Sequence, residues 1–261
     1  MATKDINLPL VVITGPTASG KTALAIDLAQ RFGGEIICAD SRTVYKGLDV
    51  GTAKPSVVEQ KLVPHWGIDL IEPNERFSVA DFKEYAVKAI QDIRARGHVP
   101  FLVGGTGLYV DAVILDYQFG REYDENTRQK LQRMTLDELY HYCEDNHINL
   151  PENDKNKRYV IRAIENAGHD SNRNVVPEFP KYIVGITTEK SELRERIGKR
   201  IEQMLENGVV DEAIMIAEKY GWDAESMKAN LYPLLRKYVA GDLEISDLKT
   251  QAVTADWHLA K

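Results

Sequence analysis

The most constraining feature of this sequence is a phosphate-binding loop close to its start. Residues 15–22 read GPTASGKT and match the pattern G-x-x-x-x-G-K-[ST] in full. The run Leu8–Thr14, which has the apolar character of a buried strand, precedes the loop, and a helical pattern over Thr22–Phe32 follows it. Because strand, loop and helix occur in this order, the segment predicts a βα unit whose connecting turn surrounds phosphate groups.

Each position of this loop has a physical role in holding a phosphate chain. The glycines let backbone N–H groups wrap around the phosphates, and the helix N-terminus adds positive partial charge. Lys21 adds a full charge, and the Thr22 hydroxyl is a candidate ligand for Mg²⁺, the expected cofactor. The predicted phosphate-binding residues are Gly15, Thr17, Ala18, Ser19, Gly20, Lys21 and Thr22. The loop alone leaves ATP, GTP and a bare diphosphate ester open as ligands.

Further strands and helices alternate along the chain. Glu35–Ala39 and Val99–Val103 read as buried strands, and a helix that begins after Ser78 lies between them. The catalytic core resumes with a strand at Tyr182–Thr187, and a helix over residues 191–207 follows. One apolar stripe of this helix carries Leu193, Ile197, Ile201 and Met204, and the rest of the chain reads as helical. This alternation predicts an α/β fold, a P-loop NTPase-like parallel sheet flanked by helices on both faces.

The helical patterns also predict core faces and a second unit. In the first helix, Ala25, Ala29 and Phe32 share one face, with Leu28 beside them, and we expect that face to be buried. Between the predicted strands, residues 117–179 are charged and mostly helical in pattern, with a loop-like end at 168–180. We assign residues 1–116 and 180–261 to the catalytic core and 117–179 to a small helical insert.

Composition limits the class of protein without indicating its function. The chain has 261 residues, of which 43% are hydrophobic and 28% charged, as in an ordinary globular protein. A net charge of −7 means that any contact with nucleic acid needs a local basic patch. Two cysteines exclude a disulfide framework and suit a reducing compartment. With no signal peptide and no apolar run near the ~18 residues of a membrane helix, we expect a cytoplasmic protein.

Two further groups are predicted at the rim of the sheet that carries the phosphate loop. Asp40 follows the second strand, and a glycine-rich turn containing Thr106 follows the third. Ligands of open α/β sheets bind at the carboxyl ends of the strands, so these groups and the phosphate loop share one rim. A carboxylate there can hold Mg²⁺ or accept a proton. A small-molecule kinase would fit this pattern equally well, because the insert supplies arginines such as Arg158 and Arg162.

Several longer segments resemble one family, the bacterial tRNA dimethylallyltransferases. The resemblance covers nearly the whole chain and is most specific in the segments DVGTAKP at 49–55 and GGTGLY at 104–109. The phosphate loop, ADSRTVY at 39–45 and VPH at 63–65 are also similar to family segments. Further on, the resemblance includes Asn153 and Asp154 with Arg158 and Arg162, and a helix with Arg196, Arg200 and Met204.

This resemblance implies a prenyl transfer onto tRNA. It implies that the phosphate loop holds dimethylallyl diphosphate with Mg²⁺, and that N6 of the adenine next to the anticodon (position 37) attacks the allylic carbon. The product is then the modified base i6A, and diphosphate is released. The implied catalytic residues are Asp40 as the base and Thr106 as a hydrogen-bond donor to the diphosphate. Charge on the leaving group is neutralised by Lys21, Arg196 or Arg200.

The resemblance also implies where tRNA is bound. The helical insert is expected to contact tRNA, and the implied tRNA-binding residues are Asp40, Ser41, Arg42, Thr43, Arg158 and Arg162. We expect a monomer with no membrane contact. A nucleotide or small-molecule kinase using ATP is the second hypothesis, and a phosphate-loop RNA-binding module without activity is the third.

The sequence departs from the family pattern at identifiable positions. Thr43 stands where the family usually has glutamine, and Leu231-Tyr232 stands where a glycine-tyrosine pair is common. The insert is also shorter than the family's. These departures concern the contact with the target base and the grip on tRNA, rather than the phosphate loop.

Overall fold

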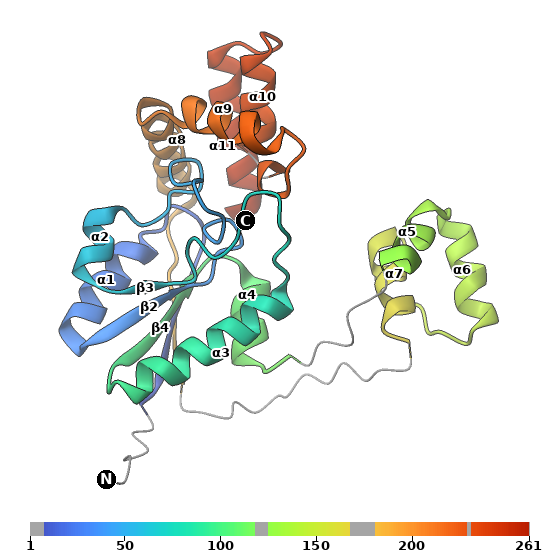
Figure 1. Cartoon of the computed structure of the whole chain (residues 1–261), viewed down its shortest axis with the longest axis horizontal. Coiled ribbons are helices and arrows are strands. Elements are labelled where there is room, and N and C mark those ends of the chain that lie inside the picture. The colour runs from blue at the N-terminus through green and yellow to red at the C-terminus, as the bar shows by residue number, and fades with distance from the viewer. Residues whose placement is uncertain (1–7, 118–124, 168–180, 229–230, 261) are drawn as a thin grey trace. The chain divides into compact units, whose positions relative to one another are not determined.

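The computed structural model describes residues 8–117, 125–167, 181–228 and 231–260. The chain divides into two compact units, of which the first comprises Met1–Ile114 and Val176–Lys261 and the second Leu115–Val175 (Figure 1). The predicted insert, 117–179, overlaps the second unit. The loop predicted at 168–180 lies outside the described residues.

A parallel sheet organises the first unit. Within the described residues it has five strands in the order β3-β2-β4-β1-β5, and every neighbouring pair is parallel. The strands are β1 (Leu10–Thr14), β2 (Gly34–Cys38), β3 (His65–Trp66), β4 (Val99–Gly104) and β5 (Lys181–Gly185). Since β1 lies between β4 and β5, the phosphate loop follows an interior strand of the described sheet. The predicted α/β class is confirmed.

Helices cover both faces of this sheet (Figure 1). They include α1 (Lys21–Phe32), α2 (Val57–Leu62), α3 (Val79–Ala95) and α4 (Gly107–Ile114). Alternate strand residues point to opposite faces, so Ile13 packs in the cluster with α1, whereas Val12 packs with α3 and α4. Ser78 caps α3 as predicted, because its hydroxyl accepts the Asp81 N–H in a capping box.

One detail of the predicted core is wrong. Phe32 was expected to face inward, but it is 65% exposed, and Ile26 is buried beside Ala25 and Ala29 instead. Phe32 is the last residue of α1, and only the cap residue Gly33 separates it from β2. The strand predicted over Tyr182–Thr187 is the edge strand β5, where Tyr182 is 65% exposed. An apolar run indicates a strand but not its place in a sheet.

The C-terminal part of the first unit is helical, as predicted. It consists of α8 (Lys190–Glu206), α9 (Val209–Tyr220), a 3₁₀ turn (Glu225–Lys228), α10 (Tyr232–Val239) and α11 (Ile245–Ala260). The predicted stripe on α8 is buried; its residues are Leu193, Ile197, Ile201 and Met204. These helices form a separate core with Val44, Tyr45 and Leu48, which follow β2. The segment after β2 is therefore held between the sheet and the C-terminal helices.

The second unit is a small helical body with its own core. Its helices are α5 (Glu125–Arg133), α6 (Leu136–Asp145) and α7 (Lys157–Glu165), and Leu139 and Val160 are fully buried among them. Glu165 is buried and pairs with Arg128 at 2.8 Å and with Arg162 at 3.2 Å.

Both cysteines of the chain, Cys38 in the first unit and Cys143 in the second, are buried and free. Among the described helices of the whole chain, none combines the length and apolar character needed to cross a membrane.

Candidate active site

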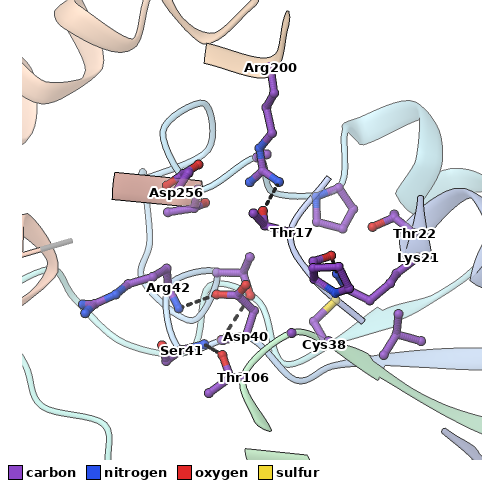
Figure 2. Close-up of a pocket in the computed structure, with 18 of the residues that line it drawn as sticks. Thr17, Lys21, Thr22, Cys38, Asp40, Ser41, Arg42, Thr106, Arg200 and Asp256 are labelled. Carbon is purple, nitrogen blue, oxygen red and sulfur yellow. Dashed lines mark hydrogen bonds between the residues drawn. The ribbon is translucent and has the colours of Figure 1, made fainter. Parts of the chain in front are cut away.

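The phosphate loop, the turn after β2 and the turn after β4 meet around one cavity of about 500 Å³ (Figure 2). Parallel strands deliver their carboxyl ends to the same rim, so segments far apart in sequence meet there. Close approach is possible because Gly104 has no side chain: a Cβ at this position would overlap the carbonyl of Ala39. The predicted shared rim is therefore present as a cavity.

The phosphate loop has the local geometry of an anion site. Gly20 adopts a left-handed conformation (φ 90°) as the N-cap of α1, and its helix has no side-chain cap. The first N–H groups of α1 are consequently left for a ligand. Thr17, Lys21 and Thr22 line the cavity. Gly15, Ala18, Ser19 and Gly20 form the rest of the loop, and the buried Ser19 hydroxyl has no hydrogen-bond partner within the described residues.

The side chain of Lys21 folds back onto its own loop. Its Nζ donates to the carbonyl oxygen of Pro16 at 2.5 Å. Burial, helped by the nearby charge of Arg200 and opposed by the carboxylate of Asp40, lowers the pKa of Lys21 to about 8. Two cations thus share one end of the cavity, and an anionic ligand would relieve their mutual repulsion.

The structure places the two predicted arginines of α8 differently. Arg200 lines the cavity, and its Nη1 donates to Thr17 Oγ1 at 2.8 Å (Figure 2). Arg196 is exposed and pairs with Glu192 at 2.7 Å. It does not line the cavity, although its Nη1 lies 4.0 Å from where a Cβ on Gly20 would stand. One turn of helix separates the two residues, and only the rotation of α8 in the fold aims Arg200 inward.

Asp40 and Thr106 are held by short local contacts at the cavity wall. Asp40 Oδ1 accepts the backbone N–H of Arg42 at 2.7 Å, which leaves Oδ2 without a hydrogen bond among the described residues. Thr106 Oγ1 accepts the backbone N–H of Ser41 at 3.3 Å (Figure 2). Because Thr106 accepts through its oxygen, its hydroxyl hydrogen is left to donate to a ligand. The arrangement presents one carboxylate and one hydroxyl donor to the same space.

The remaining residues predicted to bind tRNA differ in their exposure. Ser41, Arg42 and Thr43 all line the cavity. Ser41 and Arg42 are half-buried, whereas Thr43 is 5% exposed and donates to the carbonyl of Asp40 at 3.4 Å. Thr43 therefore supports the Asp40 turn. Arg158 and Arg162 lie on α7 in the second unit; Arg158 is exposed, and Arg162 is partly engaged by Glu165.

Sequence reasoning did not assign a role to several residues that line the cavity. Gly51, Thr52, Ala53 and Pro55 form one wall, within a segment that the sequence marked only by its resemblance. His65 lines the cavity as well, and its Nε2 is buried without a hydrogen-bond partner in the described part of the chain. Asp256 and Leu259 reach it from α11. No local pattern indicates these positions, because they come together through tertiary contacts.

The cavity suits a metal ion that takes most of its coordinating atoms from a bound substrate and from water. The described residues contain no group of three or more His, Cys, Asp or Glu side chains that could hold an ion. Thr22 and Asp40 nevertheless offer hard oxygen atoms to the same cavity. Mg²⁺ typically takes few protein ligands and completes its shell with substrate phosphates and water, so this sparse set fits Mg²⁺.

Two family models match the chain. The model described as IPP transferase matches residues 43–261, and the model described as isopentenyl transferase matches residues 8–64. Together they include the phosphate loop, the Asp40 turn, the wall at 51–55 and Arg200. The first match alone covers most of the chain.

Individual relatives agree with these models. A protein of Streptococcus pyogenes serotype M3 named tRNA dimethylallyltransferase is 37% identical over 94% of this chain and 82% of its own length. One of the same name from Staphylococcus haemolyticus is 40% identical over 92% of this chain and 78% of its own length. These names do not favour the kinase hypothesis.

Solved structures lead to the same conclusion. The tRNA isopentenylpyrophosphate transferase of Bacillus halodurans superposes with a TM-score of 0.73 at 36% identity, covering 97% of this chain and 84% of that one. A eukaryotic dimethylallyltransferase acting on tRNA has a TM-score of 0.81 at 22% identity, covering 97% of this chain and 68% of that one, and supports the P-loop NTPase-like fold. The chain therefore belongs to the IPP transferase family and is a prenyltransferase.

Proposed function

We propose that this protein transfers a dimethylallyl group from dimethylallyl diphosphate to N6 of the adenine at position 37 of tRNA, beside the anticodon. The products are i6A and diphosphate. One observation carries the proposal: a complete phosphate loop, Arg200, Thr106 and the Asp40 carboxylate meet in one cavity of a chain from this family. A transfer between a diphosphate ester and a nucleophilic amine needs these groups together.

The phosphate loop and Arg200 bind the donor's diphosphate. Backbone N–H groups at the start of α1 surround the phosphates, and Lys21 turns from the carbonyl of Pro16 to the anion. The guanidinium of Arg200 likewise turns from Thr17 to the diphosphate, and its planar group of N–H donors suits the delocalised charge of a phosphate. Thr22 would hold Mg²⁺ together with the diphosphate, and the ion would supply positive charge that neutralises part of the diphosphate charge.

Asp40 and Thr106 assist the formation of the new carbon–nitrogen bond and the cleavage of the carbon–oxygen bond. The adenine N6 forms a bond to the allylic carbon while the carbon–oxygen bond to the diphosphate breaks. Asp40 accepts the proton that N6 loses, and its Oδ2 has no competing hydrogen bond within the described residues. Thr106 donates to the oxygen that gains charge as the bond breaks, so its contribution is largest in the transition state.

The second unit and the turn after Asp40 bind tRNA. The target adenine must leave the stack of the anticodon loop to reach the cavity. Ser41 and Arg42 lie where an entering base would meet the wall. Arg158, exposed on α7 near Lys155 and Lys157, supplies positive charge for the phosphate backbone. The cytoplasmic location and the monomeric state stay predictions.

Labelled dimethylallyl diphosphate tests the proposal directly. The protein is incubated with it and Mg²⁺, with tRNA and AMP offered in separate reactions. The expected result is label in tRNA, located at N6 of adenine 37, with release of diphosphate. A parallel reaction with labelled ATP tests the kinase hypothesis. Transfer of a phosphoryl group without prenyl transfer would contradict the proposal, and label in AMP alone would correct the acceptor.

A further inference from the structure

A buried carboxylate far from the phosphate loop binds three successive backbone N–H groups. Glu212, in the first turn of α9, is 6% exposed. Its Oε2 accepts the N–H groups of Asp49 and Val50 at 2.7 Å each, and its Oε1 accepts that of Gly51 at 2.9 Å. The Tyr232 hydroxyl donates to Oε1 at 2.8 Å. Four donors thus satisfy a charge that would otherwise be costly to bury.

The loop held by Glu212 is a wall of the cavity. Residues 51–53 and Pro55 line the cavity, and Gly51 is also the last of the three residues whose N–H groups bind the carboxylate. The fit at the anchor is close: a Cβ on Gly51 would overlap the Tyr232 hydroxyl. The loop therefore has little room to shift while Glu212 and Tyr232 stay in place.

The same loop supports the turn that carries Asp40. Lys54 is buried, and its Nζ contacts Asp49 Oδ1 at 2.5 Å, Asp69 Oδ1 at 2.6 Å and the carbonyl of Tyr45 at 3.0 Å. The N–H of Asp69 donates in turn to the carbonyl of Thr43 at 3.1 Å. The Thr43 hydroxyl reaches the carbonyl of Asp40. A continuous set of polar contacts links Glu212 to the backbone of Asp40.

We infer that Glu212 is a positioning residue of the transfer reaction, which holds the loop 49–55 and, through it, the Asp40 turn in the geometry that receives the acceptor base. The inference rests on the proposed function. It concerns the acceptor side because the phosphate loop is anchored separately, by β1 and α1. Loss of the anchor therefore disturbs acceptor binding and proton transfer while leaving donor binding intact.

Glu212→Gln is the informative variant because it keeps the volume and removes one acceptor oxygen. The amide NH₂ then faces backbone donors that cannot turn away, so either the pair at Asp49 and Val50 or the one at Gly51 loses its partner. Tyr232→Phe removes one donor of the four and leaves the three backbone contacts, so its effects should be smaller. Glu195→Gln, on the exposed side of α8, is the matched control for the loss of one charge.

Two measurements on the full chain test the inference. Hydrogen exchange should show protection of the amides of residues 49–51 in the wild type and its loss in Glu212→Gln, with the sheet still protected. Steady-state kinetics should show a higher KM for tRNA and a lower kcat, on the order of 10²-fold together, with an unchanged KM for dimethylallyl diphosphate. Glu195→Gln should behave as the wild type in both.

The outcomes separate positioning from a general structural role. A smaller folded fraction lowers kcat and changes neither KM, so that result would overturn the inference, as would unchanged amide protection. If Glu212→Gln does not fold, Tyr232→Phe decides: a raised KM for tRNA supports the inference, and wild-type kinetics contradict it. If the wild type transfers no prenyl group, the proposed function fails, while amide exchange still decides whether Glu212 anchors the loop.

Discussion

Lys21 and Arg200 place two positive charges at the same end of the cavity. Burial of Lys21, together with repulsion from Arg200 and against the effect of Asp40, lowers the pKa of this lysine to about 8 from its ordinary value of 10.5. The charged form is therefore disfavoured in the free protein and favoured once an anion binds. The placement of Lys21 and Arg200 therefore favours the binding of an anion and does not add to the stability of the fold.

The pH dependence of donor binding follows from this pKa. Below pH 8 Lys21 is charged and binds diphosphate directly; above pH 8 binding must take up a proton, so affinity for dimethylallyl diphosphate falls as pH rises from 7.5 to 9.5. Titration calorimetry at several pH values measures it. Lys21→Met should bind weakly with no step near pH 8. A flat profile in the wild type would show that Lys21 does not carry the binding charge.

Asp40 has a variant that isolates its role as a base. Asp40→Asn retains an oxygen for the N–H of Arg42, which keeps the turn, but it cannot accept the proton from N6. We expect the single-turnover rate to fall by ~10²–10⁴-fold while the KM for the donor changes little. Activity within a few-fold of the wild type would reduce Asp40 to a residue that shapes the turn.

The two arginines of α8 should differ sharply in their effects. Arg200→Ala removes the guanidinium that reaches Thr17, and we expect a loss of ~3 kcal/mol in transition-state stabilisation, seen mainly in kcat. Arg196→Ala removes an exposed pair with Glu192 and should change the rate little. Single-turnover kinetics on both variants measure this. The reverse order of effects would mean that Arg196 reaches the ligand when it binds.

Whole elements were predictable where local chemistry specifies them. The phosphate loop lies between β1 and α1 as predicted, the capping box at Ser78 begins α3, and the apolar stripe of α8 is buried. The exposure of Phe32 and the edge position of β5 were not predictable. Helical periodicity indicates which residues share a face, and an apolar run indicates a strand, but neither shows which other segments pack against it. The burial of a helix or strand depends on segments that are distant in the sequence.

The cap of α3 gives a test at the scale of one helix. Ser78→Ala removes the acceptor for the Asp81 N–H and should lower the free energy of unfolding of the first unit by ~1 kcal/mol. Ser191→Ala, in the first turn of α8 but not at its N-cap, is the matched control and should be nearly neutral. Urea unfolding compares the two. Equal effects would mean that the box adds nothing to the stability of α3.

At the scale of the whole molecule, an acidic chain has to bind an acidic substrate. The net charge is −7, so tRNA binding needs positive charge gathered locally, and the exposed Arg158 on α7 of the second unit is a candidate for it. Donor and acceptor are therefore expected to be bound by different parts of the chain. Changes in the second unit should affect only one of the two substrates.

Charge reversal tests this division. Arg158→Glu should weaken tRNA binding and lower the slope of log affinity against log salt by about 1, with an unchanged KM for dimethylallyl diphosphate. Arg31→Glu makes the same charge change at the far end of α1 from the phosphate loop and should leave tRNA binding nearly unchanged. Filter binding at several salt concentrations compares them. Equal losses would place the tRNA-binding surface elsewhere.

The sequence by itself determined the phosphate loop, the strand–helix alternation and the rim that Asp40 and Thr106 share with the loop. These follow from local geometry and from the direction of parallel strands. Only the tertiary structure decided that Arg200 rather than Arg196 lines the cavity, that burial lowers the pKa of Lys21, and that Glu212 holds a loop 161 to 163 residues away. Such features depend on packing between distant segments, and packing is set by the fold as a whole.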